Sequence, residues 1–308
     1  MHSVLVTGGS GFIGSQTLAP LAARGFRVHV ASRRLPSTVA VSHDITFHKC
    51  DLDSPEQVWR LLHETRPTHL LHLAWYAEHG RFWTSPKNLD CVAASLTLCR
   101  AFAECGGKRI VAAGTCAEYD WTTGAERFAE SSPVKPHTLY GRAKDSLRSI
   151  LEQWSAGAGL SSAWGRVFLL YGPGEDERRL VPSIAGPLAE GGIAKCLCGT
   201  HVRDFLHVND VADAFAALVD SQVAGPVNIS SGEGIELGQV ARLLAGPSVP
   251  TGRLQIEQRP FTPENPQHIV GDATRLRDEV GWRPSRTLEQ GLNEFRNEMA
   301  YKSARPAA

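Results

Sequence analysis

A tyrosine and a lysine four residues apart carry the clearest chemistry in this sequence. Tyr140 and Lys144 have the spacing that places two side chains on one face of a helix. A free tyrosine titrates near pH 10, and a nearby ammonium favours the phenolate. Lowering that pKa by about 3 units requires roughly 4 kcal/mol of differential stabilisation. The pair could therefore move a proton at an oxygen while hydride moves at the adjoining carbon, and the hydroxyl of Thr115 could hydrogen-bond the same oxygen.

A glycine-rich loop near the N-terminus is the second feature that could do chemistry. Residues 8–14 read GGSGFIG and separate a predicted strand, 3–7, from a predicted helix, 12–24. Glycines in such a loop allow a tight turn and bring backbone amides against a pyrophosphate, and the helix N-terminus adds partial positive charge. The loop therefore predicts a dinucleotide site formed by Gly8, Gly11, Phe12, Ile13 and Gly14.

The end of the second predicted strand bears on which dinucleotide is bound. An acidic residue at this point would hold the ribose hydroxyls of NAD, but the chain has Ser32, Arg33 and Arg34. Guanidinium groups pair with a 2′-phosphate in a forked geometry. The sequence therefore favours NADP(H), with NAD(H) possible; the alternative is that both arginines are ordinary solvated loop residues.

The elements that must position these residues alternate along the chain. Predicted strands at 3–7, 27–31, 45–50, 70–74, 109–113 and 161–170 are separated by amphipathic or capped helical stretches at 12–24, 54–64, 89–104 and 140–155. This alternation predicts an α/β fold, a Rossmann-type doubly wound parallel sheet with ligands at the carboxyl ends of the strands.

Elements become shorter after Tyr171, with a helix at 208–220, a short strand at 227–229 and a final helical tail at 285–299. We therefore expect a dinucleotide-binding domain formed by residues 1–170, with residues 206–229 rejoining it later in the chain. A smaller C-terminal substrate-binding lobe is expected from 171–205 and 230–308.

Composition excludes several classes of partner. The 308 residues have a formal net charge of +0, so no basic excess favours nucleic acid. No apolar run is long enough to cross a membrane, and the N-terminus enters a strand directly, so a cytoplasmic location is expected. The 7 cysteines indicate reduced thiols, and Cys196 with Cys198 lacks a second pair at metal spacing, so no metal site is expected.

Taken in order, these motifs resemble the extended short-chain dehydrogenase/reductase superfamily, in its sugar-nucleotide epimerase/dehydratase group. The resemblance covers nearly the whole chain and includes the glycine loop, CDLD at 50–53, HLA at 72–74, Tyr140 with Lys144, YGPG at 171–174, RDFLHV at 203–208 and the stretch 276–284. It implies that Asp51 and Leu52 border the adenine and that Leu73 and Ala74 border the cofactor backbone. It also implies a catalytic set of Thr115, Tyr140 and Lys144, and a contact of Arg203 with a nucleotide diphosphate.

Departures from the family pattern narrow the expected reaction. Dehydratases carry an Asp-Glu pair directly after the catalytic hydroxyl, whereas this chain has Cys116 and Ala117, so elimination of water is not expected. Leu169 and Cys91 stand where the family often has asparagine. The aromatic segment 75–83 loosely resembles 4-keto-6-deoxysugar reductases, and Trp75 could pack on a deoxysugar or, alternatively, serve internal packing.

We therefore expect NADPH-dependent reduction of the C4 ketone of a nucleotide-linked 4-keto-6-deoxyhexose, with Trp75, Thr115, Cys116 and Arg203 at the substrate. The alternative is a nucleotide-sugar 4-epimerase using bound NAD(P). Related proteins commonly dimerise, so by analogy a homodimer through the helices 89–104 and 140–155 is expected.

Overall fold

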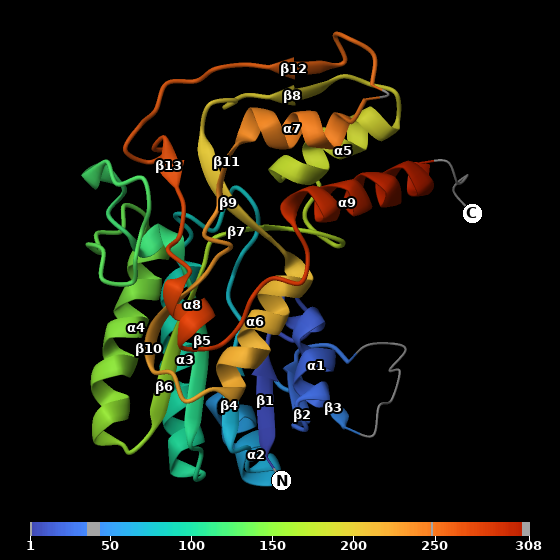
Figure 1. The fold of residues 1–308 in the computed structure, drawn as a ribbon. Helices are drawn as coiled ribbons and strands as arrows, with labels where there is room; N and C mark the ends of the chain where they lie inside the picture. Colours follow the sequence, from blue (N-terminus) through green and yellow to red (C-terminus); the bar gives the residue numbers. More distant parts are fainter. Residues whose placement is uncertain (1, 36–43, 248, 304–308) are drawn as a thin grey trace.

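A seven-stranded parallel sheet forms the centre of the computed structural model, which describes residues 2–35, 44–247 and 249–303 (Figure 1). The strand order is β10-β6-β5-β4-β1-β2-β3, and every neighbouring pair is parallel. The strands are β1 (Ser3–Thr7), β2 (Arg27–Ser32), β3 (Ile45–Lys49), β4 (His69–His72), β5 (Arg109–Thr115), β6 (Ser161–Val167) and β10 (Gly225–Ile229).

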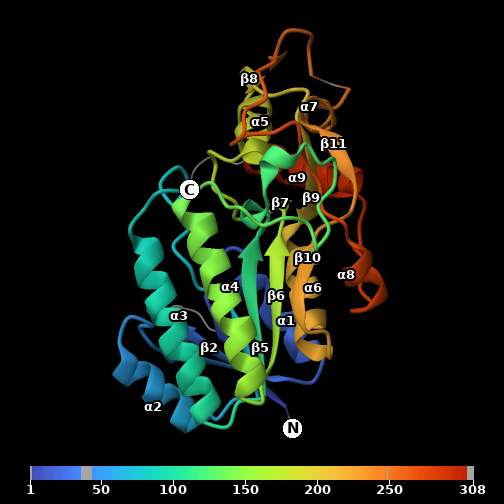
Figure 2. The ribbon, with the colours of Figure 1, turned by 90° about the vertical axis from the view of Figure 1, so that its left-hand side faces the viewer.

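Helices cover both faces of this sheet (Figure 2). One face packs against α1 (Gly14–Ala23) and α6 (Val208–Asp220), and the other packs against α2 (Pro55–Thr65), α3 (Lys87–Glu104) and α4 (Leu139–Gly157). Burial on two sides explains why inner strands such as β1 are nearly continuous buried runs; all of β5 is buried, whereas the edge strand β3 is only partly buried. The predicted Rossmann-type doubly wound sheet is confirmed.

Chain order in the sheet reverses at β1. Strands β2 and β3 lie on one side of β1, whereas β4, β5 and β6 lie on the other. Two successive connections leave in opposite directions at such a switch point, so a crevice opens at the carboxyl ends of β1 and β4. The glycine loop follows β1 and therefore lies at the floor of that crevice.

A smaller lobe lies beyond the carboxyl ends of the central strands, at the top of Figure 1. Its sheet is centred on β9 (Val202–His207), which pairs with β7 (Leu169–Tyr171), β11 (Gly234–Glu236) and β13 (His268–Ile269). A separate pair joins β8 (Ala194–Cys196) to β12 (Leu254–Ile256). The remaining helices are α5 (Leu180–Ala189), α7 (Leu237–Ala245), α8 (Thr274–Asp278), α9 (Leu288–Ser303) and the short 3-10 turns η1 (Cys116–Glu118) and η2 (Trp121–Thr123).

Two expectations about these elements were wrong or incomplete. The single strand predicted at 161–170 is two strands, because the chain leaves the central sheet at Phe168 and β7 joins the sheet of the lobe. Neither α5 nor α7 was predicted; α5 contains Pro187, which weakens a helical pattern.

In the part of the chain that the structure describes, no helix is long and apolar enough to cross a membrane.

Candidate active site

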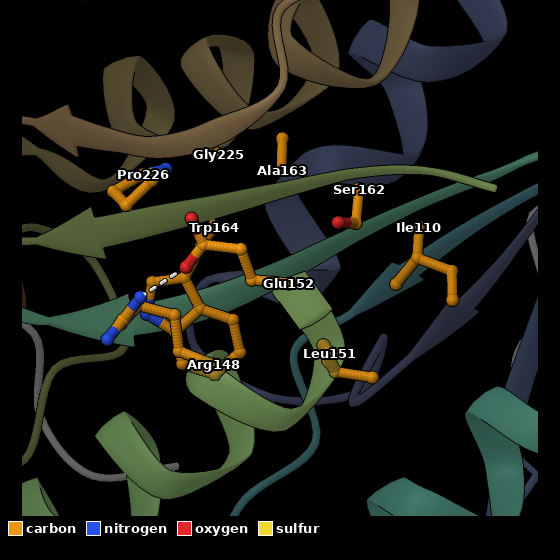
Figure 3. Close-up of a pocket in the computed structure, with 9 residues that line it drawn as sticks. All are labelled: Ile110, Arg148, Leu151, Glu152, Ser162, Ala163, Trp164, Gly225 and Pro226. Atoms are coloured by element: carbon orange, nitrogen blue, oxygen red, sulfur yellow. Dashed lines mark hydrogen bonds and ion pairs between the residues drawn. The ribbon is translucent and has the colours of Figure 1, made fainter. Parts of the chain in front are cut away.

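A cleft of about 1230 Å³ lies between the carboxyl ends of the central strands and the smaller lobe. Its walls include the glycine loop, Thr115, Tyr140, Lys144 and Arg203. A second hollow, between α4, β6 and β10, measures only about 10 Å³ (Figure 3). That volume holds about one water molecule. The large cleft is therefore the candidate site.

The glycine loop has the backbone that a pyrophosphate cradle requires. Gly8 has a φ of +73°, and a Cβ there would lie 2.7 Å from the amide nitrogen of Ala74. A Cβ at Gly14 would lie 2.1 Å from the carbonyl oxygen of Gly8. Helix α1 begins at Gly14 with no side-chain cap, and although the amides of Ser15 and Gln16 donate to the carbonyls of Gly11 and Ile13, the partial positive charge of the helix N-terminus favours an anion there. The loop thus fits the diphosphate of a dinucleotide, and Phe12 and Ile13 also line the cleft.

The end of β2 shows how Ser32, Arg33 and Arg34 are arranged. Ser32 is buried, and its hydroxyl donates to the carbonyl oxygen of Arg34 at 2.7 Å. Ser32 and Arg33 line the cleft, as do Asp51 and Leu52. Arg34 is not among the residues that line it. The structure therefore brings Arg33, rather than both arginines, to the predicted ribose position.

A buried histidine supports the strand end from which Leu73 and Ala74 enter the cleft. Ser95 Oγ donates to the carbonyl of Cys91, so it accepts from His72 Nε2 at 2.7 Å. His72 Nδ1 then accepts from the hydroxyl of Thr7, also at 2.7 Å. This arrangement uses the neutral imidazole, and burial lowers the pKa of His72 to about 3.

The start of α4 determines where Tyr140 and Lys144 lie on the helix. Thr138 caps the helix by accepting the amide of Gly141 at 3.1 Å, so Tyr140 falls in the first turn and Lys144 one turn later. Burial raises the pKa of Tyr140, and a hydrogen bond with Thr115 lowers it. The structure therefore places Thr115, Tyr140 and Lys144 in one cluster.

Lys144 is held from two sides. Its Nζ donates to the carbonyl of Ala113 at 2.8 Å and lies 3.8 Å from the centre of the Trp75 ring. Burial lowers the pKa of Lys144 to about 7, while the charges of Glu118 and Cys91 raise it. The Trp75 ring, for which sugar packing was one of two predicted roles, is thus in contact with Lys144 and also lines the cleft.

Thr115 is positioned by a buried ion pair that the sequence did not reveal. Its amide donates to Glu118 Oε1 at 2.9 Å, and its hydroxyl accepts the amide of Ala117 at 3.2 Å. Glu118 in turn accepts from Trp164 Nε1 at 2.9 Å and from Arg166 Nε at 2.7 Å. The Thr-x-x-Glu spacing of a capping box was the signal that could have identified Glu118.

Arg203 lines the cleft but already holds its own lobe together. Its guanidinium donates to the carbonyls of Val202 at 2.8 Å, Gln267 at 3.0 Å and Pro266 at 3.0 Å, and to Asn265 Oδ1 at 2.5 Å. A diphosphate would therefore meet a cation that is already fixed in place.

Two further groups line the cleft. Burial raises the pKa of the Cys116 thiol to about 12, so it is a poor proton donor. Glu175, which sequence reasoning missed, lines the cleft, and burial raises its pKa to about 8. Its Oε2 has no hydrogen-bond partner among the described residues.

The chain is also similar to proteins of known family. A family model described as the NAD dependent epimerase/dehydratase family matches residues 4–230. The chain belongs to this family.

Similar proteins in the family have more than one activity. A UDP-glucose 4-epimerase of Corynebacterium glutamicum is 27% identical over 92% of this chain and 91% of its own. A dTDP-glucose 4,6-dehydratase of Xanthomonas campestris pv. campestris is 27% identical over 95% and 91%. Among solved structures, the Thermus thermophilus UDP-glucose 4-epimerase in complex with NAD has a TM-score of 0.82 at 28% identity, covering 98% of this chain and 100% of that one.

Proposed function

We propose that this protein is a nucleotide-sugar 4-epimerase that oxidises C4 of the hexose and reduces it again on the opposite face. One observation carries the proposal: Thr115, Tyr140 and Lys144 meet in a cleft that also contains a pyrophosphate-binding glycine loop. The full-length similarity to UDP-glucose 4-epimerases supports the epimerase reading over the reductase reading that the sequence first suggested.

The residues that line the cleft include groups suited to binding a dinucleotide. The glycine loop and the N-terminus of α1 would hold the diphosphate, and Asp51, Leu52, Leu73 and Ala74, which line the cleft, would border the adenine and the cofactor backbone. Lys144 orients the ribose next to the nicotinamide. A bound cofactor in its oxidised state would supply the hydride acceptor for the sugar carbon and, once reduced, the hydride donor for the return step.

Tyr140 is the proposed acid–base group at the C4 oxygen. Burial raises its pKa in the free protein, so the phenolate needs the ammonium of Lys144 and the hydroxyl of Thr115. The Lys144 pKa of about 7 means that its protonation changes near neutral pH. Tyr140 takes the hydroxyl proton as hydride leaves, and it gives the proton back after the keto sugar has turned within the cleft.

Cys116 and Ala117 argue against a dehydratase. Elimination of water needs a proton donor and a base beside the hexose, and these two positions provide neither, because the Cys116 thiol is buried with a pKa of about 12.

Arg203 is the proposed contact to the diphosphate of the substrate.

A second candidate rests on the end of β2. No acidic side chain stands at Ser32, and Arg33 lines the cleft. This favours NADP(H), a cofactor that reductases consume as a reagent, and so supports NADPH-dependent reduction of a nucleotide-linked 4-keto-6-deoxyhexose. The same cluster of Thr115, Tyr140 and Lys144 would then protonate the new alkoxide.

Cofactor stoichiometry separates the two candidates. Purified protein is incubated with UDP-glucose, dTDP-glucose, UDP-N-acetylglucosamine and nucleotide-linked 4-keto-6-deoxyhexoses, and sugars and cofactor are followed by NMR and absorbance. An epimerase gives the C4 epimer with no net change in cofactor. Stoichiometric loss of NADPH with a keto sugar, and no epimer, would establish the reductase instead. In either case Tyr140→Phe should lose about 10²–10⁴-fold in turnover.

We also propose a homodimer through α3 and α4. Leu89 on α3 and Ile150 on α4 are large apolar side chains that remain exposed, with 59% and 46% of their surface accessible. Light scattering after gel filtration should give twice the 33.4 kDa chain mass, and a monomer at micromolar concentration would refute the proposal.

A further inference from the structure

The aromatic segment 75–83 contacts both members of the Tyr140–Lys144 pair. Trp75 lies with its ring 3.8 Å from Lys144 Nζ. At the other end of the segment, the Phe82 ring meets the Tyr140 ring edge-on at 4.8 Å, and the carbonyl of Trp83 accepts the Tyr140 amide at 3.1 Å. The two contacts come from opposite ends of one loop.

Asn88 ties these two ends together. It is completely buried, and its Oδ1 accepts from Trp75 Nε1 at 2.9 Å. Its Nδ2 donates to the carbonyls of Phe82 at 2.7 Å and Ser85 at 2.9 Å. Both ends of the loop are therefore fixed to one side chain in the first turns of α3.

We propose that Trp75 is a positioning residue whose ring face holds the ammonium of Lys144 in register with Tyr140, and that Asn88 orients that ring. This inference rests on the proposed catalytic roles of Tyr140 and Lys144. A ring face attracts a desolvated cation, so the indole offsets part of the burial that disfavours the charged lysine. The Ala113 carbonyl fixes the ammonium from another side, so its position is defined by both contacts.

The other groups that act on Lys144 come from three further elements. Glu118 of η1 and Cys91 of α3 raise its pKa. His72 of β4 is neutral, because burial and the lysine charge both lower its pKa. Tyr140 shares helix α4 with the lysine. A substitution at Trp75 replaces none of these groups, although Cys91 accepts the amide of the adjoining Tyr76 at 3.4 Å. The comparison of an aromatic with an aliphatic replacement at Trp75 therefore reports on the ring.

The test compares Trp75→Phe with Trp75→Leu. Both variants lose the N–H that Asn88 accepts, but only phenylalanine keeps an aromatic face. Trp59→Leu is the control, since Trp59 on α2 stacks on His63 rather than on a lysine. The pKa of Lys144 is read from the shift of lysine ¹³Cε signals during a pH titration, with the signal assigned by Lys144→Met.

We expect Trp75→Leu to have a Lys144 pKa lower than Trp75→Phe by about half to one pH unit, with the control unchanged. The alkaline limb of turnover should move by the same amount. Equal values in the two variants, or a higher value in Trp75→Leu, would overturn the inference. The NMR titration needs no substrate, so absence of sugar turnover in the wild-type protein would refute the proposed function and leave this test intact.

Discussion

Replacing Glu118 by glutamine should destabilise the protein far more than its small change in shape suggests. The Glu118–Arg166 pair is at 2.7 Å, and the exposed fractions of the two side chains are 0% and 1%. Glutamine has one acceptor oxygen, which can serve the Thr115 amide and Trp164, but its NH₂ group then faces the Arg166 Nε–H. The change leaves a buried guanidinium without a countercharge.

Breaking one partner of such a buried pair costs about 3–5 kcal/mol. The matched control is Glu152→Gln, because Glu152 pairs with Arg148 on the surface of α4 and its side chain is 55% exposed. An exposed pair contributes only about 0.2–1 kcal/mol. Urea unfolding of both variants, followed by fluorescence, measures the difference directly.

A loss below about 1 kcal/mol for Glu118→Gln, or one equal to that of the control, would show that Arg166 finds another partner and that the buried ion pair is not a major source of stability. A folded Glu118→Gln protein should also show a Lys144 pKa below about 7, because the glutamate charge raises it.

Three further predictions concern the cofactor cleft and its support. Gly14→Ala should abolish dinucleotide binding measured by calorimetry, since its Cβ would lie 2.1 Å from the Gly8 carbonyl, whereas Gly157→Ala, with open space around it, should bind normally. Stability should fall as the pH drops from 6.5 toward about 3, because the unfolded chain protonates a His72 that is neutral when folded; urea midpoints of His72→Asn should depend less on pH over that window. Ser32→Asp combined with Arg33→Ser should shift the preference from NADP(H) to NAD(H) in a binding titration, and an unchanged ratio would show that the end of β2 does not select the cofactor.

Local patterns determined what could be predicted about the fold. The strand at 3–7 and the helix at 208–220 were predicted to the residue, because the strand is a short apolar run and the helix repeats apolar residues at helical spacing. The smaller lobe could not be predicted in the same way. Its strands are only two to six residues long, and they pair with partners far along the chain, as β7 and β13 do with β9.

The same distinction applies to the site. Tyr140 and Lys144 are four residues apart on one helix, so their proximity follows from local geometry alone. Glu118 and Arg166 meet across 48 positions in the sequence, and Arg203 bonds to a segment more than 60 positions away. Such contacts depend on which strands pair within each sheet, β5 with β6 and β9 with β13, and the spacing of residues does not encode that pairing.

Deuterium placed at C4 of UDP-glucose, dTDP-glucose and UDP-N-acetylglucosamine tests the central claim most directly, since the claim is hydride transfer at that carbon. The account predicts a C4 epimer that retains the deuterium at C4, a rate slowed by the label, and turnover by Tyr140→Phe that is lower by about 10²–10⁴-fold. Product formed with exchange of a C3 or C5 hydrogen with solvent and no effect of the C4 label, or full turnover by Tyr140→Phe, would contradict it.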